Sequence, residues 1–165
     1  MQKAIFPGTF DPPTVGHQDL IRRAGKLSDF LYLSVAQAHH KKTLFTLEER
    51  KKMLELTAAE VLEKNKFTVI TFDGLLIDLC RKLQTNVVIR GLRDSRDFEY
   101  ERRIGGVNQI MFEEFETVYL QSYGNTASIS SEILREVIKL NGNTEKLLPK
   151  SITDFVREKI INKTA

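Results

Sequence analysis

Five short runs rich in Val, Ile, Phe and Tyr alternate with helical patterns along most of this chain, which narrows the folds open to it. The runs are residues 3–6, 30–36, 67–72, 86–90 and 117–121. Several are apolar on both faces, as parallel strands are when helices cover both sides of the sheet. The alternation therefore predicts an α/β fold built on a five-stranded parallel sheet.

Six segments carry helical patterns, and the last of them follows Pro149. They are residues 16–27, 46–64, 74–84, 97–115, 130–142 and 151–161. In the second, Thr46 and Glu49 predict a capping box, and apolar residues through Val61 and Leu62 share one face. The expected fold is doubly wound (Rossmann-like), with helices on both faces and an extra C-terminal helix, in one domain over residues 1–165.

Composition excludes several classes of function. The formal charge is +3 and the basic residues are mixed with acidic ones, which argues against a nucleic-acid groove and favours a small anionic ligand. The N-terminus lacks the apolar core of a signal peptide, and no stretch reaches the roughly 20 apolar residues of a membrane span, so we expect a cytoplasmic protein. The lone cysteine, Cys80, is expected to be a buried, inert thiol.

In a doubly wound sheet, ligands bind beyond the carboxyl ends of the strands, so the functional residues are expected in the loops that follow the strands. The loop after the first run reads PGTFDPPTVGH. Gly8 and Gly16 allow close backbone approach, Thr9 and Thr14 offer hydroxyl groups, and His17 stands at a helix start that favours anions. The alternative is a proline-rich connection in which His17 caps the helix. Neither common phosphate-loop motif occurs in the chain.

Two further loops carry basic residues. Lys41 and Lys42 precede the second helix, and Arg90 and Arg93 surround Gly91 at the end of the fourth run. Guanidinium groups fixed at a strand end can bind phosphate through two hydrogen bonds, although such arginines also serve as salt bridges beside helices.

Ser130 and Ser131 stand where the fifth helix begins, which is both a common N-cap and an anion-binding position. Helix starts and basic side chains thus converge at one sheet edge. No nucleophile and base stand together, and no carboxylate cluster suggests a protein-built metal site. These residue types suit nucleotidyl transfer by positioning and charge neutralisation, without a covalent intermediate.

The motifs PGTFDPPTVGH, KKTLFTLEER, IRGLRDSRDFEYE and SISSEILREV resemble those of the bacterial phosphopantetheine adenylyltransferases, in the T/H-x-G-H nucleotidyltransferase superfamily. The match runs from Lys3 to about Val137. The resemblance implies reversible adenylyl transfer from ATP to 4′-phosphopantetheine, giving dephospho-coenzyme A and pyrophosphate, with Mg²⁺ held mainly by the substrate phosphates. It also implies a homohexamer, and it leaves open whether coenzyme A is a feedback ligand.

The resemblance also implies roles for single residues. His17 would stabilise the transition state, Lys41 and Arg90 would hold the attacking phosphate, Thr9 would position both substrates, and Leu76 would line the pantetheine arm. The positions that match the family's ATP site are Thr9, Phe10, His17, Gly91, Leu92, Arg93, Glu101, Thr126, Ala127, Ser128, Ile129, Ser130, Ser131 and Glu132.

Some residues depart from the family pattern. Glu132 replaces a hydroxyl residue, and a carboxylate facing a triphosphate would repel it, so we expect Glu132 to turn away. The double glycine at Gly105 and Gly106 predicts a kink or a close packing contact in the fourth helix. Apolar residues near the end of that helix, Ile110 to Phe112, could form a subunit interface or belong to the core.

Two alternatives stay open. One is a nucleotidyltransferase of the same fold with another phosphorylated acceptor, such as nicotinate mononucleotide. The other is a non-catalytic nucleotide-binding module, which would tolerate the loss of His17, whereas His17 and both arginines are present here.

Overall fold

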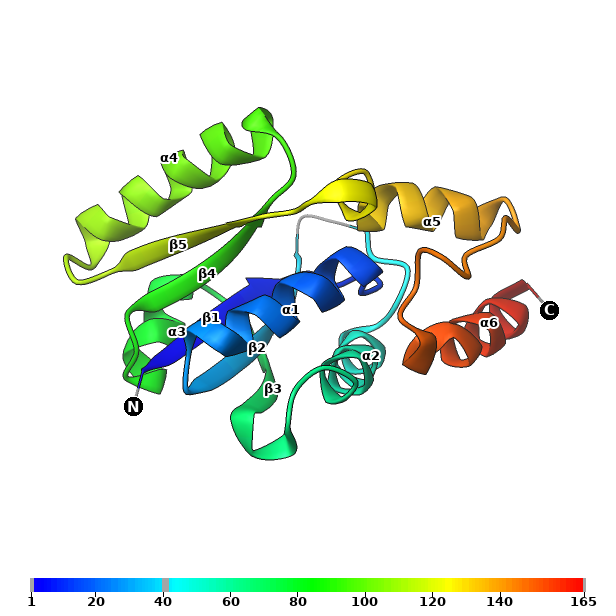
Figure 1. Ribbon diagram of the computed structural model, residues 1–165, viewed down its shortest axis with the longest axis horizontal. Helices are drawn as coiled ribbons and strands as arrows, with labels where there is room; N and C mark the ends of the chain where they lie inside the picture. The colour runs from blue at the N-terminus through cyan, green and yellow to red at the C-terminus, as the bar shows by residue number, and fades with distance from the viewer. Residues whose placement is uncertain (1, 40–41, 165) are drawn as a thin grey trace.

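The computed structural model describes residues 2–39 and 42–164, and the side chains as far as residue 161. Five parallel strands form one sheet in the order β3-β2-β1-β4-β5 (Figure 1). The strands are β1 (Lys3–Gly8), β2 (Phe30–Ala36), β3 (Phe67–Phe72), β4 (Val87–Leu92) and β5 (Glu116–Gln121). The chain extends the sheet in one direction from β1 to β3 and then in the other through β4 and β5. The switch point between β1 and β4 confirms the predicted doubly wound fold.

Helices cover both faces of the sheet (Figure 1). They are α1 (Val15–Leu27) and α2 (Leu47–Ala59) on one face, and α3 (Leu76–Leu83) and α4 (Ser95–Met111) on the other. Side chains alternate along β1 accordingly: Phe6 packs in the cluster with α1 and α2, and Ile5 in the cluster with α3. Burial on both sides explains why these strands are continuously apolar.

The last two helices lie beside the carboxyl end of the sheet rather than over a face (Figure 1). They are α5 (Ser131–Lys139) and α6 (Lys150–Thr164). Leu134 of α5 and Ile152 of α6 join Met53 of α2 in a separate buried cluster. This cluster holds the start of α5 near the loops that follow the strands, and α6 is the predicted extra helix.

The start of α2 agrees with the sequence prediction, and its end does not. The capping box of Thr46 and Glu49 is confirmed, but α2 ends at Ala59 rather than at residue 64. The last turn tightens there, where the amide of Val61 donates to the carbonyl of Ala58 three residues back and shares it with the amide of Leu62. Both side chains still pack against the core. They therefore share the predicted apolar surface without being helical.

The double glycine does not interrupt α4, and the predicted close packing contact is confirmed at Gly105. A Cβ there would lie 3.1 Å from the hydroxyl of Tyr119 and 3.2 Å from that of Thr117 on β5. A Cβ at Gly106 would meet nothing within 4 Å. Gly105 is thus the one of the pair that α4 needs in order to approach β5.

The structure bears on the predictions about membrane-spanning segments and about the lone cysteine. Across the described residues, no helix combines the length and the apolar character needed to span a bilayer. Cys80 is buried in α3, and burial raises the pKa of its thiol to about 11. The predicted burial of this thiol is confirmed, and a thiol of that pKa stays protonated at neutral pH.

Candidate active site

A cavity of about 330 Å³ lies beyond the carboxyl ends of β1 and β4, where the strand order reverses. Its walls come from the loop after β1, the start of α1, the end of β4, the start of α4, the loop before α2 and the start of α5. Among the lining side chains that the structure describes, four are cationic and four are carboxylates. They are Lys42, Arg90, Arg93 and Arg135, with Asp11, Asp97, Glu101 and Glu132.

The loop after β1 holds a strained, buried aromatic residue against the cavity. Phe10 has a φ of 50°, in the left-handed region that costs a non-glycine residue on the order of 1 kcal/mol. Its ring lies so close to Gly8 that a Cβ there would be 2.9 Å from the ring atoms. The same ring packs edge-on against His17, with centroids 5.2 Å apart. Phe10 therefore limits the orientations open to the imidazole.

His17 belongs to a capping box at the start of α1, which fixes its tautomer. The amide of Thr14 donates to Nδ1 at 3.1 Å, and the hydroxyl of Thr14 accepts from the amide of His17 at 3.2 Å. Nδ1 is thus an acceptor, so the neutral ring carries its proton on Nε2. Burial, and then the charge of Arg93, lower the pKa of His17 to about 4. The ring is therefore a neutral hydrogen-bond donor at physiological pH. It also takes part in capping α1, which is the role that the alternative interpretation gave it.

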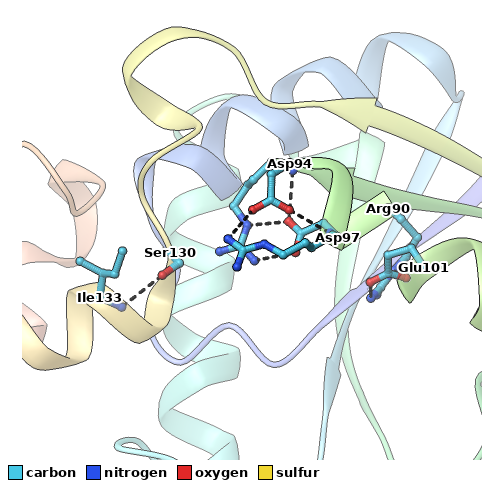
Figure 2. Close-up of polar contacts among 8 residues, drawn as sticks. Arg90, Asp94, Asp97, Glu101, Ser130 and Ile133 are labelled. Atoms are coloured by element: carbon cyan, nitrogen blue, oxygen red, sulfur yellow. Dashed lines mark hydrogen bonds and ion pairs between the residues drawn. The ribbon is translucent and has the colours of Figure 1, made fainter. Parts of the chain in front are cut away.

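Arg90 is held rigidly at the end of β4 (Figure 2). Its Nε and Nη2 both donate to the carboxylate of Glu101, and its Nη1 donates to the carbonyl of Pro7 at 2.9 Å. The side chain of Glu101 is only 12% exposed, so the pair is largely shielded from water. Glu101, which matches an ATP position, contacts the predicted phosphate-binding arginine.

Arg93 is paired in the same manner just before the N-cap of α4. Its Nε and Nη2 donate to the carboxylate of Asp97 at 2.8 and 3.0 Å. The hydrogen bonds that Arg93 donates to Asp97, and the negative charges of Asp97, Asp94 and Glu132, raise the pKa of Arg93. Glu132 is exposed, yet it is among the residues that line the cavity, and its charge acts on Arg93. That its side chain turns away from the triphosphate stays a prediction.

The two serines at the start of α5 differ in what they do. Ser130 is the N-cap, and its hydroxyl accepts from the amide of Ile133 at 3.1 Å (Figure 2). The hydroxyl of Ser131 donates to the carbonyl of Pro12 at 2.8 Å, which ties α5 to the loop after β1. N-capping by Ser130 is thus confirmed, and both serines also line the cavity.

The cavity gathers most of the predicted site residues. These are Thr9, Phe10, His17, Arg90, Gly91, Arg93, Glu101, Thr126, Ile129, Ser130, Ser131 and Glu132. Its described lining does not include Leu76, Leu92, Ala127 or Ser128. Leu76 begins α3 and packs, partly buried, in the apolar cluster on that face. Lys41 lies outside the described residues, and its neighbour Lys42 lines the cavity.

Two residues that sequence reasoning missed hold this site together. Arg50 of α2 is 1% exposed and donates to the carbonyls of Thr9 and Ala36, both at 2.8 Å. Asp11 is also 1% exposed, and its carboxylate accepts from the amides of Leu44 and Phe45 at 2.8 and 2.9 Å. The only signal for Asp11 was a charged residue between an aromatic residue and two prolines. Arg50 looked like an ordinary residue of a charged helix.

The donor set bears on whether the protein could hold Mg²⁺ directly. No group of three or more His, Cys, Asp or Glu side chains that could enclose a metal ion occurs in the part of the chain that the structure describes. Asp97 and Glu101 are engaged by arginines and Asp11 by two amides. Since Mg²⁺ prefers six oxygen ligands, this set fits an ion carried by substrate phosphates and water.

Comparisons with known proteins show the family to which the chain belongs. Residues 5–137 match the model of the cytidylyltransferase-like family. The chain is 44% identical over 154 residues to the phosphopantetheine adenylyltransferase of Campylobacter jejuni, covering 93% of this chain and 96% of the relative. It is 42% identical over 160 residues to that of Dichelobacter nodosus, covering 97% and 96%.

The fold is similar to a solved structure from Vibrio parahaemolyticus that carries the provisional name nicotinate-nucleotide adenylyltransferase. The TM-score is 0.71, with coverage of 95% of this chain and 99% of the other. The sequences are 14% identical, and at this level the likeness shows the fold alone.

Proposed function

Because this chain belongs to the cytidylyltransferase-like family, and within it to the phosphopantetheine adenylyltransferases, we propose that its cavity is the site of adenylyl transfer from ATP to 4′-phosphopantetheine. The products are dephospho-coenzyme A and pyrophosphate, in coenzyme A biosynthesis. The observation that carries the assignment of the site is the meeting of His17, Arg90, Arg93 and the start of α5 in one cavity at the switch point.

The chemistry follows from the side chains present. An oxygen of the acceptor phosphate attacks the α-phosphorus of ATP in line, and the bond from that phosphorus to the β-phosphate oxygen breaks as pyrophosphate leaves. Negative charge grows on the α-phosphate oxygens. The Nε2 proton of His17, aimed by the Thr14 capping box and the Phe10 ring, is a donor for that charge.

The two substrates are held from different walls. Arg90, with Lys41, holds the acceptor phosphate, and Glu101 and the carbonyl of Pro7 keep the Arg90 guanidinium in place. Arg93 and the start of α5 hold the triphosphate of ATP, and Thr9, which also lines the cavity, positions both substrates. Mg²⁺ bound to the phosphate oxygens would neutralise part of the triphosphate charge.

The proposed acceptor is tested by the release of pyrophosphate. The purified protein should release pyrophosphate from ATP only when 4′-phosphopantetheine and Mg²⁺ are both supplied, and chelation of the metal should stop the reaction. A coupled pyrophosphate assay over a panel of phosphorylated acceptors measures this. Full activity with nicotinate mononucleotide and none with phosphopantetheine would overturn the assignment.

We also propose a homohexamer that assembles through α4. Asn108 is the only residue that is buried among those of this helix, and Ile110 is 87% exposed in an apolar face with Val107 and Met111. Exposed apolar surface on one helix is typical of a subunit interface. Phe112 lies partly in the core beside α3, so it is not part of this face.

The assembly is tested by Ile110→Lys, which places a charge in the proposed interface. We expect light scattering after size exclusion to show a smaller species than the wild type, because a buried unpaired charge is costly. Leu140→Lys is the matched control, since Leu140 is 81% exposed at the end of α5 and outside this face. A hexamer that survives the Ile110 change, or a wild-type monomer, would contradict the proposal.

A further inference from the structure

Asp11 is a buried carboxylate in the loop after β1 that the proposed chemistry does not use. The residue is 1% exposed. Its two carboxylate oxygens accept from the amides of Leu44 and Phe45, at 2.8 and 2.9 Å. We propose that Asp11 is a positioning residue for the acceptor phosphate and that it acts through residues 42–45. This proposal rests on the proposed function for the identity of the acceptor.

The two amides are the closest partners of the Asp11 carboxylate. Arg135 lies 3.6 Å from it, and the nearer contact of that arginine, at 2.8 Å, is with the backbone carbonyl of Asp11. The carbonyl contact does not depend on the side chain at position 11. What the side chain provides is therefore a pair of acceptors for Leu44 and Phe45. An asparagine there has one acceptor oxygen, so its NH2 group would face one of the two amides.

Residues 42–45 run from the cavity wall to the start of α2, and packing fixes them at the α2 end. Lys42 and Thr43 line the cavity. Phe45 is 1% exposed in the cluster that α2 forms with α5 and α6, and α2 begins two residues later. Between these two parts, the hydrogen bonds to Asp11 set the direction of the backbone.

The place of the lysines depends on this anchor. Lys42 is two residues from Leu44, a span of at most about 7 Å of extended chain, so a displaced Leu44 amide displaces Lys42 as well. Lys41, which the proposed function assigns to the acceptor phosphate, directly precedes Lys42 in the sequence. A misplacement of about 1 Å is enough to slow a reaction greatly. The effect of Asp11 is therefore expected on the acceptor rather than on ATP.

The test is Asp11→Asn, which keeps the shape of the side chain but removes the charge and one acceptor. The KM for phosphopantetheine should rise by about tenfold or more, the usual loss when a charge-assisted hydrogen bond is removed, and kcat should fall. The KM for ATP should stay within about threefold. Asp29→Asn is the matched control, because Asp29 also accepts a backbone amide, that of Gln2, and is not in the described cavity lining. It should keep both wild-type KM values.

A double-mutant cycle separates positioning from a purely structural role. In a Lys41→Ala background, Asp11→Asn should raise the KM for the acceptor by less than about threefold further, because the group that it helps to place is gone. Val69→Ala removes buried methyl groups from the edge strand β3 and supplies the structural comparison. It should lower the melting temperature and raise neither KM. Losses that multiply in the cycle, or equal rises in both KM values, would overturn the proposal.

Hydrogen exchange tests the anchor without turnover. The peptide that covers residues 42–46 should exchange about tenfold faster or more in Asp11→Asn, and peptides from β2 should exchange as in the wild type. Unchanged exchange over residues 42–46 would overturn the proposal, because Asp11 would then not hold this segment. If the wild type uses another phosphorylated acceptor in place of phosphopantetheine, the same selective rise in KM for that acceptor would support the role of Asp11 and overturn the proposed function instead.

Discussion

His17→Ala should lower kcat by about a hundredfold or more while the affinity for ATP changes much less. The physical reason is that the Nε2 proton meets charge that develops on the α-phosphate only as the reaction proceeds. Steady-state kinetics with both substrates, and ATP binding measured by calorimetry, give the two quantities separately. Equal losses in turnover and in ATP affinity would make His17 a binding residue.

The capping role of His17 needs its own control, because the alanine also removes the acceptor for the Thr14 amide. Glutamate is the usual residue at this position of a capping box, so His17→Glu keeps the cap and supplies no N–H donor. It should melt near the wild-type temperature and remain inactive. An active His17→Glu protein would show that the cap, and not the donor, is what turnover requires.

The low pKa of His17 leads to a prediction about the pH dependence of the reaction. Since the pKa of His17 in the free protein is about 4, the ring is already neutral across about pH 6 to 8 and its ionisation leaves no break in kcat/KM there. An inflection near the ordinary histidine pKa would contradict a neutral donor.

Arg50→Met should lower the free energy of unfolding by about 3 kcal/mol, the largest loss of stability that we expect from one substitution in this site. Methionine fills much of the space but leaves the carbonyls of Thr9 and Ala36 without a donor in a buried place. For a chain of this length, the melting temperature should fall by about 10 °C. Thermal denaturation followed by circular dichroism measures the change.

Glu55→Met is the matched control for Arg50. It removes a charge at an exposed position of the same helix and should change stability by less than about 0.5 kcal/mol. If Arg50→Met melts with this control, the carbonyls of Thr9 and Ala36 have found other donors, and Arg50 does not hold the loop after β1.

The sheet was predictable from the sequence because each strand is an apolar run bounded by helical patterns, and a buried parallel strand needs little else. The early end of α2 was not. Val61 and Leu62 keep the apolar periodicity of the helix, and the tighter hydrogen bond from the amide of Val61 to the carbonyl of Ala58 marks the turn. Periodicity reports which face is buried and does not report where the backbone ends its helix.

The same limit applies to the site. The resemblance predicted that Glu101 belongs to an ATP position, but the pairing of Glu101 with Arg90 depends on how α4 lies beside β4. The sequence did not indicate the roles of Arg50 and Asp11, because burial of a single charged residue depends on neighbours far away in the chain. Thr9 lies 41 positions from Arg50, and Leu44 lies 33 from Asp11. Such separations leave no local signal.

The carboxylates among the described lining residues affect how substrates are bound. A strongly positive cavity attracts every anion over a distance of about one Debye length, and its association rates fall with added salt. Glu101 and Asp97 each offset the charge of one arginine and fix the direction of its guanidinium. Phosphate oxygens that reach Arg90 and Arg93 therefore meet donors that are already aligned.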